Sequence, residues 1–350
     1  MNEQGRQNKM SEQGAPNKPG EIASAKTRTS LAGESAFGRL FTIESLRRTF
    51  PLIFLVTLIL VFSSFSSRFI SHDNMMTVLE QGTVLLVVSL ALTFIIMSGS
   101  IDISVGSIVG LTALVAALTA PTLGAWAMVP AVAVGAACGL VNGLLLAIGK
   151  VPSFIATMGT MVVYRGMVLF FTRGAPVEIS NNQFLDVFGD YSWGISHQVM
   201  IGLLLALVAW AIITYTVFGR EVRAIGGGER VAILTGIAVP RVKITMFLLL
   251  GILCGFAGIL QGARTMAASA QLGQGLELDA IAAVVVGGTP LTGGVGSIVN
   301  TMLGVLIITL LSNGMNMAGV DPYLQNIVKG LVLICAVFIT IDRKKIGIIK

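Results

Sequence analysis

The 350-residue chain is 54% hydrophobic, is only 11% charged and has a mean hydropathy of +0.86. Soluble proteins carry about 25% charged residues, so this composition excludes an ordinary soluble protein and indicates a polytopic membrane protein. The net charge of +6 does not indicate nucleic-acid binding, because orientation in a membrane explains basic residues in tails and loops. Cys138, Cys254 and Cys335 are isolated and form no cluster with His72 or His197, so neither a metal site nor a disulfide is expected.

Residues 1–45 are rich in Gln, Asn, Ser and Lys. They contain almost no apolar run that could offset the entropy of ordering, so we expect a disordered cytoplasmic tail. A signal peptide would place a short apolar region within about the first 30 residues, and none is there, so no cleavage is expected. Residues 46–345 are expected to form a transmembrane domain, and residues 346–350 a cytoplasmic C-terminus.

Uncharged runs define the expected spans, because roughly 20 apolar residues in a helix cross a bilayer core of about 30 Å. They predict an all-α polytopic fold of about ten transmembrane helices, some broken, with the eighth a half-span. The runs are Thr49–Ser67, Gln81–Ile101, two spans within Ile103–Gly149 that turn at Ala120–Gly124, Val151–Thr172, Tyr191–Gly219, Ile244–Ala263, Ala280–Val320 broken at Gly287–Gly296, and Tyr323–Ile341.

The distribution of basic residues predicts that both termini are cytoplasmic. Eighteen Lys and Arg residues then lie inside: eight before residue 49, Lys150, five within Phe218–Lys243 and four at the C-terminus. The outer segments hold three, which are Arg68, Arg173 and Arg264. This strong excess inside follows the positive-inside rule.

The longest polar interruption of the spans is Phe218–Lys243. Within it, VAILTGI is short, amphipathic and flanked by Gly228 and Gly236, which suits a small helix that lies in a groove of a partner. We expect this loop to contact a cytoplasmic partner. Its candidate residues are Arg223, Gly226, Gly228, Glu229, Ala232, Leu234 and Gly236.

Two glycine-rich breaks interrupt the spans. In Ser98–Ser107 (SGSIDISVGS), Asp102 or Ser104 is expected to cap the following helix, and contact with a transported polar molecule is the alternative. The second break, GGTPLTGGVGS, matches neither GxxxxGK[ST] nor GxGxxG, so the chain is expected to hold no ATP site and no cofactor. VGSIV occurs at Val105–Val109 and again at Val295–Val299, which leaves internal duplication open.

Polar residues within the spans are candidates for lining a translocation pathway, and each is also a candidate for a hydrogen bond between helices. The candidates are Asp102, Ser104, Ser107, Thr157, Thr160, Thr289, Thr292, Asn313 and Asn316. No catalytic residue is expected. Arg165 and Lys329 fall within spans and are expected to have structural roles. Glycines at Gly135, Gly139 and Gly143, and at Gly251, Gly255 and Gly258, are expected to let helices pack closely.

The largest outer segment is Arg173–Gln198, which holds Glu178, Asp186, Asp190 and Trp193. It is either a docking surface for an extracytoplasmic partner or a solvated loop with an aromatic anchor at the membrane interface. The sequence leaves both interpretations open.

Five motifs occur along the chain in the order SGSIDISVGS, VPSFIATMGTMVVYRG, FGREVRAIGGGERVAILTGI, GGTPLTGGVGS and DPYLQNIVKGLVLICAV. With these motifs the chain resembles the membrane permeases of binding-protein-dependent ABC importers of the ribose, xylose and galactose type over about residues 50–345. Ser100, Gly228, Pro290 and Asn300 depart from the family's usual residues, and the last two bear on the substrate.

The resemblance implies a translocation pathway formed by two permease subunits, identical or paralogous, in the bacterial inner membrane. It implies that a cytoplasmic ABC ATPase pair binds the Phe218–Lys243 loop and that an extracytoplasmic sugar-binding protein delivers a monosaccharide. The implied fold is vitamin-B12-permease-like.

Three other functions are alternatives to sugar transport. An ABC permease for a nucleoside or an autoinducer-2 type of signal would share the motifs. An ion-coupled secondary transporter would need acidic or His relays at mid-span, whereas Glu80, Asp102, Glu277 and Asp279 lie at predicted span ends. An intramembrane peptidase would need a nucleophile with a base, or paired Asp, inside the membrane.

Overall fold

A computed structural model describes residues 43–340 of the chain, and residues 1–42 and 341–350 lie outside the described part. Most of the predicted tail 1–45 and all of the predicted C-terminal segment 346–350 therefore lie outside it. The chain divides into two units after Leu46, and the helices that follow Leu46 in the sequence belong to the second unit, which begins at Arg47.

The described residues are mostly helical. The long helices are α2 (Ile43–Phe65), α3 (His72–Met97), α4 (Val105–Leu123), α5 (Met128–Ala147), α6 (Ser153–Thr172), α8 (His197–Tyr215), α11 (Val239–Thr265), α13 (Ile298–Met317) and α14 (Pro322–Thr340). The short elements are the 3-10 helix η1 (Gly124–Ala127), α7 (Asn182–Gly189), α9 (Val217–Gly227), α10 (Glu229–Leu234) and α12 (Leu276–Val286).

Six helical segments among residues 43–340 are long and apolar enough to cross a membrane, and one of them, Val105–Ala147, joins α4, η1 and α5. Thr49–Phe65 and Pro322–Phe338 are shorter apolar helices. The chain is therefore a multi-pass helical membrane protein, as predicted. α12 has eleven residues, about 16 Å at 1.5 Å per residue, which is too short to cross a core of about 30 Å.

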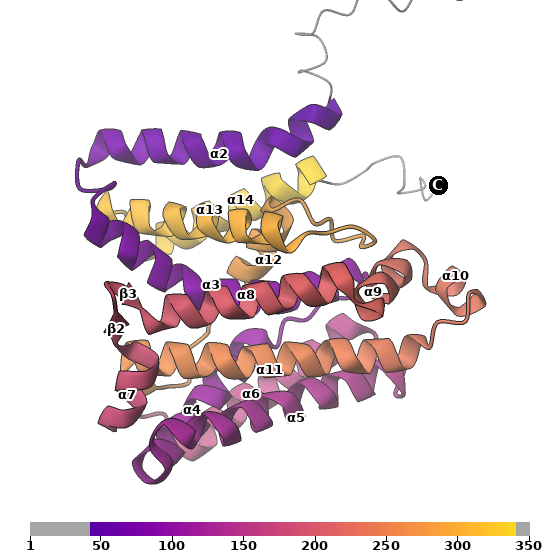
Figure 1. The fold of residues 1–350 in the computed structure, drawn as a ribbon, viewed down its shortest axis with the longest axis horizontal. Coiled ribbons are helices and arrows are strands. Elements are labelled where there is room, and N and C mark those ends of the chain that lie inside the picture. Colours follow the sequence, from indigo (N-terminus) through magenta and orange to yellow (C-terminus); the bar gives the residue numbers. More distant parts are fainter. Residues whose placement is uncertain (1–42, 341–350) are drawn as a thin grey trace, which may run out of the picture. The chain divides into compact units, whose positions relative to one another are not determined.

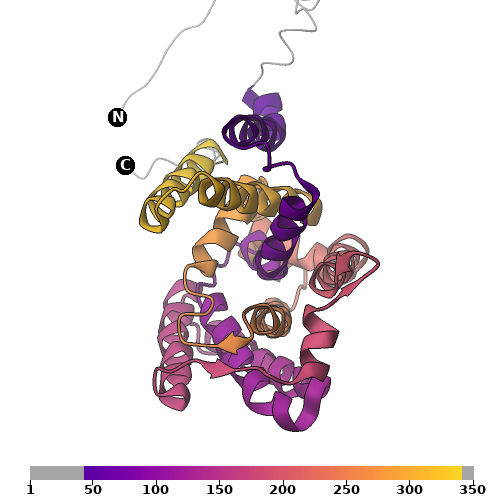
Figure 2. The ribbon, with the colours of Figure 1, turned by 90° about the vertical axis from the view of Figure 1, so that its left-hand side faces the viewer.

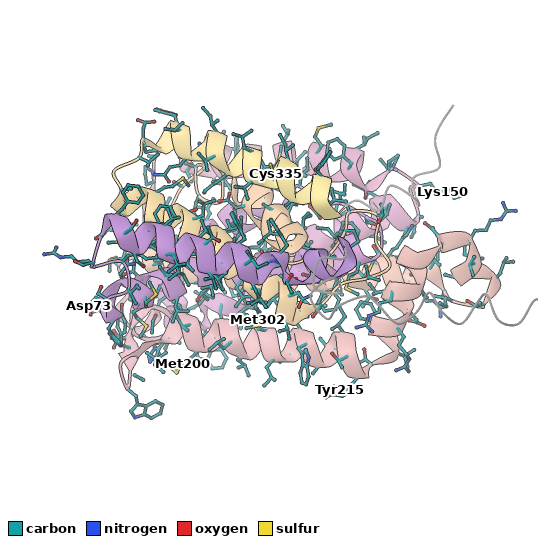
Figure 3. The ribbon with its side chains drawn as sticks, turned by 90° about the horizontal axis from the view of Figure 1, so that it is seen from above. Asp73, Lys150, Met200, Tyr215, Met302 and Cys335 are labelled. Atoms are coloured by element: carbon teal, nitrogen blue, oxygen red, sulfur yellow. The ribbon has the colours of Figure 1, made fainter. Side chains whose placement is uncertain are left out.

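The long helices run side by side between two ends of the bundle (Figure 1). One end carries α7 and the hairpin of β2 (Tyr191–Ser192) with β3 (Ile195–Ser196), and we call it the α7 end. The other carries α9 and α10, and we call it the α10 end. Figure 3 shows Asp73 at the α7 end and Lys150 at the α10 end.

Two short strand pairs organise the α7 end. β1 (Val177–Glu178) pairs with β4 (Ala267–Ala268), which ties the segment after α6 to the segment after α11. In the β2–β3 hairpin, Trp193 and Gly194 have positive φ, as a tight hairpin turn requires. Trp193 is 94% exposed at this tip, which is compatible with both interpretations of the outer segment.

α5 and α11 form the closest helix pair, and α11 also packs against α3 and α4. A Cβ built on Gly135 or Gly139 would overlap backbone atoms of Gly251 or Phe247 in α11. This confirms the prediction that the glycines allow close helix packing. Viewed end on, α4–α6 lie on one side of the bundle and α13 and α14 on the opposite side (Figure 2).

Several predicted boundaries were wrong, each for a local reason. α3 begins at His72 rather than at Gln81, because Ser71 caps it by accepting from the Asn74 N–H. Glu80 therefore lies inside this helix and not at its end. α8 begins only at His197, because the preceding residues form the β2–β3 hairpin.

The predicted Phe218–Lys243 loop is also mostly helical, since α9 and α11 extend into it from either side. α9 continues to Gly227 and α11 begins at Val239, so that α10 is the element between them. Thr216 caps the start of α9, because its hydroxyl accepts a hydrogen bond from the Gly219 N–H. The prediction missed this cap because Thr216 lies within a longer uncharged run.

Candidate functional site

The first break, Ser98–Ser104, is closed by a buried polar network. Asp102 is fully buried, and its Oδ1 accepts hydrogen bonds from the backbone N–H and the hydroxyl of Ser104, both at 2.7 Å. Its Oδ2 accepts from the amide of Asn142 in α5 at 3.2 Å. Ser104 occupies the N-cap position of α4, but its side chain makes no capping hydrogen bond, and the Asp102 carboxylate instead accepts from the Ser104 N–H just before the helix.

The backbone of this break is held from α6. Ser153 accepts from the Ile101 N–H at 3.2 Å, and Thr157 accepts from the Ile103 N–H at 3.3 Å. The Ser153 and Thr157 side chains thus supply hydrogen-bond acceptors for backbone N–H groups that lie outside any helix. A non-helical segment within the bundle needs such acceptors. Ser153 and Asn142 were missed from the sequence. A lone amide in the apolar run of α5 was the available signal for Asn142.

The second break, Gly287–Ser297, is shaped by backbone conformation instead. Gly288, Gly293 and Gly294 have positive φ angles of 93°, 79° and 83°. The Gly294 N–H donates to the Met97 carbonyl at 2.8 Å, so this break is bonded to the last residue of α3, where the first break begins.

Gly226 of α9 lies against both breaks. A Cβ built there would overlap the Met97 carbonyl oxygen and the Gly294 nitrogen, so only glycine fits this approach. The adjacent Gly227 has open space around it. Three motifs that lie far apart in the sequence therefore meet at the α10 end.

α10 presents apolar side chains away from the bundle. Val231, Ile233 and Leu234 are 64%, 56% and 80% exposed, whereas Ala232 is buried. Glu229 forms an ion pair of 2.8 Å with Lys243 at the start of α11, which fixes one end of the short helix. The other predicted loop residues lie around it: Arg223 and Gly226 in α9, Gly228 between the helices, and Gly236 after α10 with a φ of 86°.

The nine predicted pathway residues do not converge on one site. Thr292 and Asn316 are exposed, and Asn316 accepts from the Gln325 side chain at 2.7 Å. Asn313 exchanges hydrogen bonds of 3.0 Å with Asn74. The residues that the structure buries are Asp102, Ser104, Ser107, Thr157, Thr160, Thr289 and Asn313.

Both basic residues within the spans have partners. The Arg165 guanidinium donates to the carbonyls of Ala270 and Leu272, which lie between β4 and α12. Lys329 of α14 forms an ion pair of 2.8 Å with Asp279 of α12. Arg165 thus bonds to backbone groups within the bundle, a structural contact of the kind the sequence predicts.

These features define a multi-pass membrane protein with two broken helical regions joined at one end, an organisation typical of transporters. The family model described as "Branched-chain amino acid transport system / permease component" matches residues 74–337, and the chain belongs to this family.

Curated relatives cover most of the chain. The ribose import permease protein RbsC of Escherichia coli strain K12 is 40% identical over 313 residues, which are 88% of this chain and 97% of that protein. The RbsC protein of Bacillus subtilis strain 168 is 39% identical over 302 residues, 84% and 92% of the two chains. The L-arabinose ABC transporter permease protein AraH of Azospirillum brasilense is 35% identical over 271 residues, 77% and 80% of the two chains. No solved structure matches the chain.

Proposed function

We propose that this chain is the membrane permease subunit of an ATP-driven ABC importer for a monosaccharide, a pentose, a hexose or a related polyol, in the bacterial inner membrane. The observation that carries this proposal is its 40% identity to a ribose import permease across nearly the full length of that protein. A family description alone would leave the solute open between sugars and amino acids.

The finer architecture belongs to the same proposal. It comprises about ten spans within residues 46–345, a vitamin-B12-permease-like fold and cytoplasmic termini, and the excess of basic residues on the proposed inner side supports the orientation. In this orientation the α10 end faces the cytoplasm and the α7 end faces outward. Arg173–Gln198 then lies on the side from which an extracytoplasmic sugar-binding protein delivers the solute.

The energy source in this proposal is a separate ATPase subunit that docks on α10. The exposed Val231, Ile233 and Leu234 offer an apolar face to a groove, a common mode of helix recognition. A shift of α9 would reach both breaks, because Gly226 packs on Met97 and Gly294. A second permease subunit, identical or paralogous, completes the pathway, for which the nine predicted polar residues remain candidates.

Deletion of the gene in the bacterium that carries it tests the proposal. We expect uptake of one labelled monosaccharide, from a panel of ribose, xylose, arabinose and galactose, to fall to background and to return with a plasmid copy. ATP depletion should abolish this uptake, and an uncoupler in ATP-replete cells should not.

Two results would contradict the proposal. Loss of nucleoside or autoinducer-2 uptake, with every sugar unaffected, would favour a non-sugar ABC permease. Uptake that survives ATP depletion and collapses with the ion gradient would favour a secondary transporter, for which Glu80 inside α3 is the residue to examine.

A further inference from the structure

Two cavities with charged and amide side chains among apolar ones in their walls adjoin at the first turn of α12, and together we call them the α12 vestibule. One has a volume of about 380 Å³ and the other about 730 Å³, within the usual range for ligand sites. Gln274, Asp279 and Lys329 line both, Gln81 lines the smaller and Asn326 lines the larger.

The vestibule lies part of the way along the helices and not at the α7 end itself. Hydrogen bonds between Asn74 and Asn313 and between Asn316 and Gln325 show that α3 begins, α13 ends and α14 begins at one end. From there Lys329 lies seven residues into α14, about 10 Å along the axis, and Gln81 lies nine residues into α3, about 14 Å. The vestibule therefore reaches membrane depth from the α7 end.

Charged side chains at this depth indicate water rather than lipid. The side chains of Asp279 and Lys329 are 25% and 21% exposed, and an ion pair that faced hydrocarbon would be costly. Ionisable residues within membrane spans usually face an aqueous cavity or a pathway. The Thr309 hydroxyl on the wall of the smaller cavity is buried and makes no hydrogen bond in the described structure.

The chemistry of the walls fits a neutral polyhydroxyl solute. Arg264, Lys329 and Asp279 line the smaller cavity, a net formal charge of +1, and Lys329, Glu277 and Asp279 line the larger, a net of −1, so the charges cancel only over the whole vestibule. The amides of Gln81, Gln274 and Asn326 offer both donors and acceptors, as sugar hydroxyls require.

We propose that the α12 vestibule binds the sugar through its hydroxyls as the solute enters the permease, with Gln274, Asn326 and the Asp279–Lys329 pair as contact residues. The proposal rests on the proposed function and names the part of the chain that meets the substrate. Lys329 then has a functional role in place of the structural role expected from the sequence. Of the nine pathway candidates, Asn316 lies on the vestibule wall.

The test uses the complete importer, purified through a tag on the full-length chain and reconstituted in proteoliposomes with its binding protein. Wild-type sugar uptake and basal ATP hydrolysis are measured first. Gln274→Leu and Asn326→Leu change exposed residues and should fold normally. Each should lower uptake about tenfold, as the loss of one hydrogen bond to the solute predicts, with basal ATP hydrolysis unchanged.

Gln183→Leu is the matched control, because Gln183 is also an exposed amide but lies in α7, outside the vestibule lining. It should transport as the wild type does. The exchanged pair Asp279→Lys with Lys329→Asp should keep the complex assembled but change the preference among ribose, xylose and arabinose. A purely structural ion pair would leave that preference unchanged.

The outcomes separate the two proposals. If the wild-type complex transports no sugar, the proposed function fails and the vestibule proposal fails with it. If the wild type transports sugar and both leucine variants match it within about twofold, the vestibule proposal alone is overturned.

Discussion

The two breaks solve the same problem, a non-helical backbone inside a helix bundle, by different means. In the first, side chains supply the partners: Asp102 bonds Ser104, and Ser153 and Thr157 accept from the backbone. In the second, the backbone N–H groups donate mostly to nearby carbonyls and to the Met97 carbonyl, and three glycines with positive φ determine the backbone conformation.

This difference predicts different mechanical roles. A segment held by three side-chain acceptors, of which Asp102 and Thr157 are buried, has little freedom, because another path would leave its backbone donors unpaired. A glycine-rich segment with the exposed Thr292 has fewer such constraints. We therefore expect the first break to act as a fixed support and the second to move during transport.

The largest expected effect is on the first break. Asp102→Ala should lower the free energy of unfolding by about 2–5 kcal/mol, because it removes the buried acceptor of the Ser104 N–H and hydroxyl and leaves the Asn142 amide only the Ser104 hydroxyl as a partner. Denaturant unfolding in detergent micelles measures it. The control is Thr292→Ala in the second break, which should change stability by less than about 0.5 kcal/mol. Equal effects would remove the distinction between the breaks.

A smaller effect is expected at a glycine of the second break. Gly288→Ala should cost about 1–2 kcal/mol through its φ of 93° alone, because no other atom lies within 4 Å of an added Cβ. Gly159→Ala in α6 also enters open space but in a helix, so it should stabilise by about 0.5–1 kcal/mol. The same sign for both variants would show that backbone conformation does not govern this break.

The smallest effect is expected at Thr289, whose buried hydroxyl makes no hydrogen bond in the described structure. Thr289→Val should change the free energy of unfolding by less than about 0.5 kcal/mol. Thr93→Val, which breaks the 2.8 Å bond between Thr93 and Thr301, should cost about 1 kcal/mol in the same assay. If Thr289→Val is the costlier variant, an unseen partner holds that hydroxyl.

Local patterns predicted much of this fold because membrane spans depend on composition over about 20 residues. The glycine packing of α5 on α11, the shortness of α12 and the start of α4 at Ser104 all followed from nearby residues. Boundaries failed where a capping residue, such as Ser71, began a helix among polar side chains. The uncharged-run rule cannot detect such a start.

Contacts between distant segments could not be predicted. Nothing near Gly226 indicates that its partners are Met97 and Gly294, and nothing near Lys329 indicates Asp279, fifty residues away. The three-dimensional path of the chain brings these groups together. The vestibule was missed for the same reason, because its walls come from α3, α11, α12, α13 and α14.

In the proposed importer, α9 links a docked ATPase to both breaks through the close approach at Gly226. Sugar-stimulated ATP hydrolysis in reconstituted importers that carry Gly226→Ala or its neighbour Gly227→Ala tests this link. We expect Gly226→Ala to lose stimulation by about tenfold or more, whereas Gly227→Ala, whose added methyl enters open space, should behave as the wild type. Wild-type stimulation in both variants would contradict it.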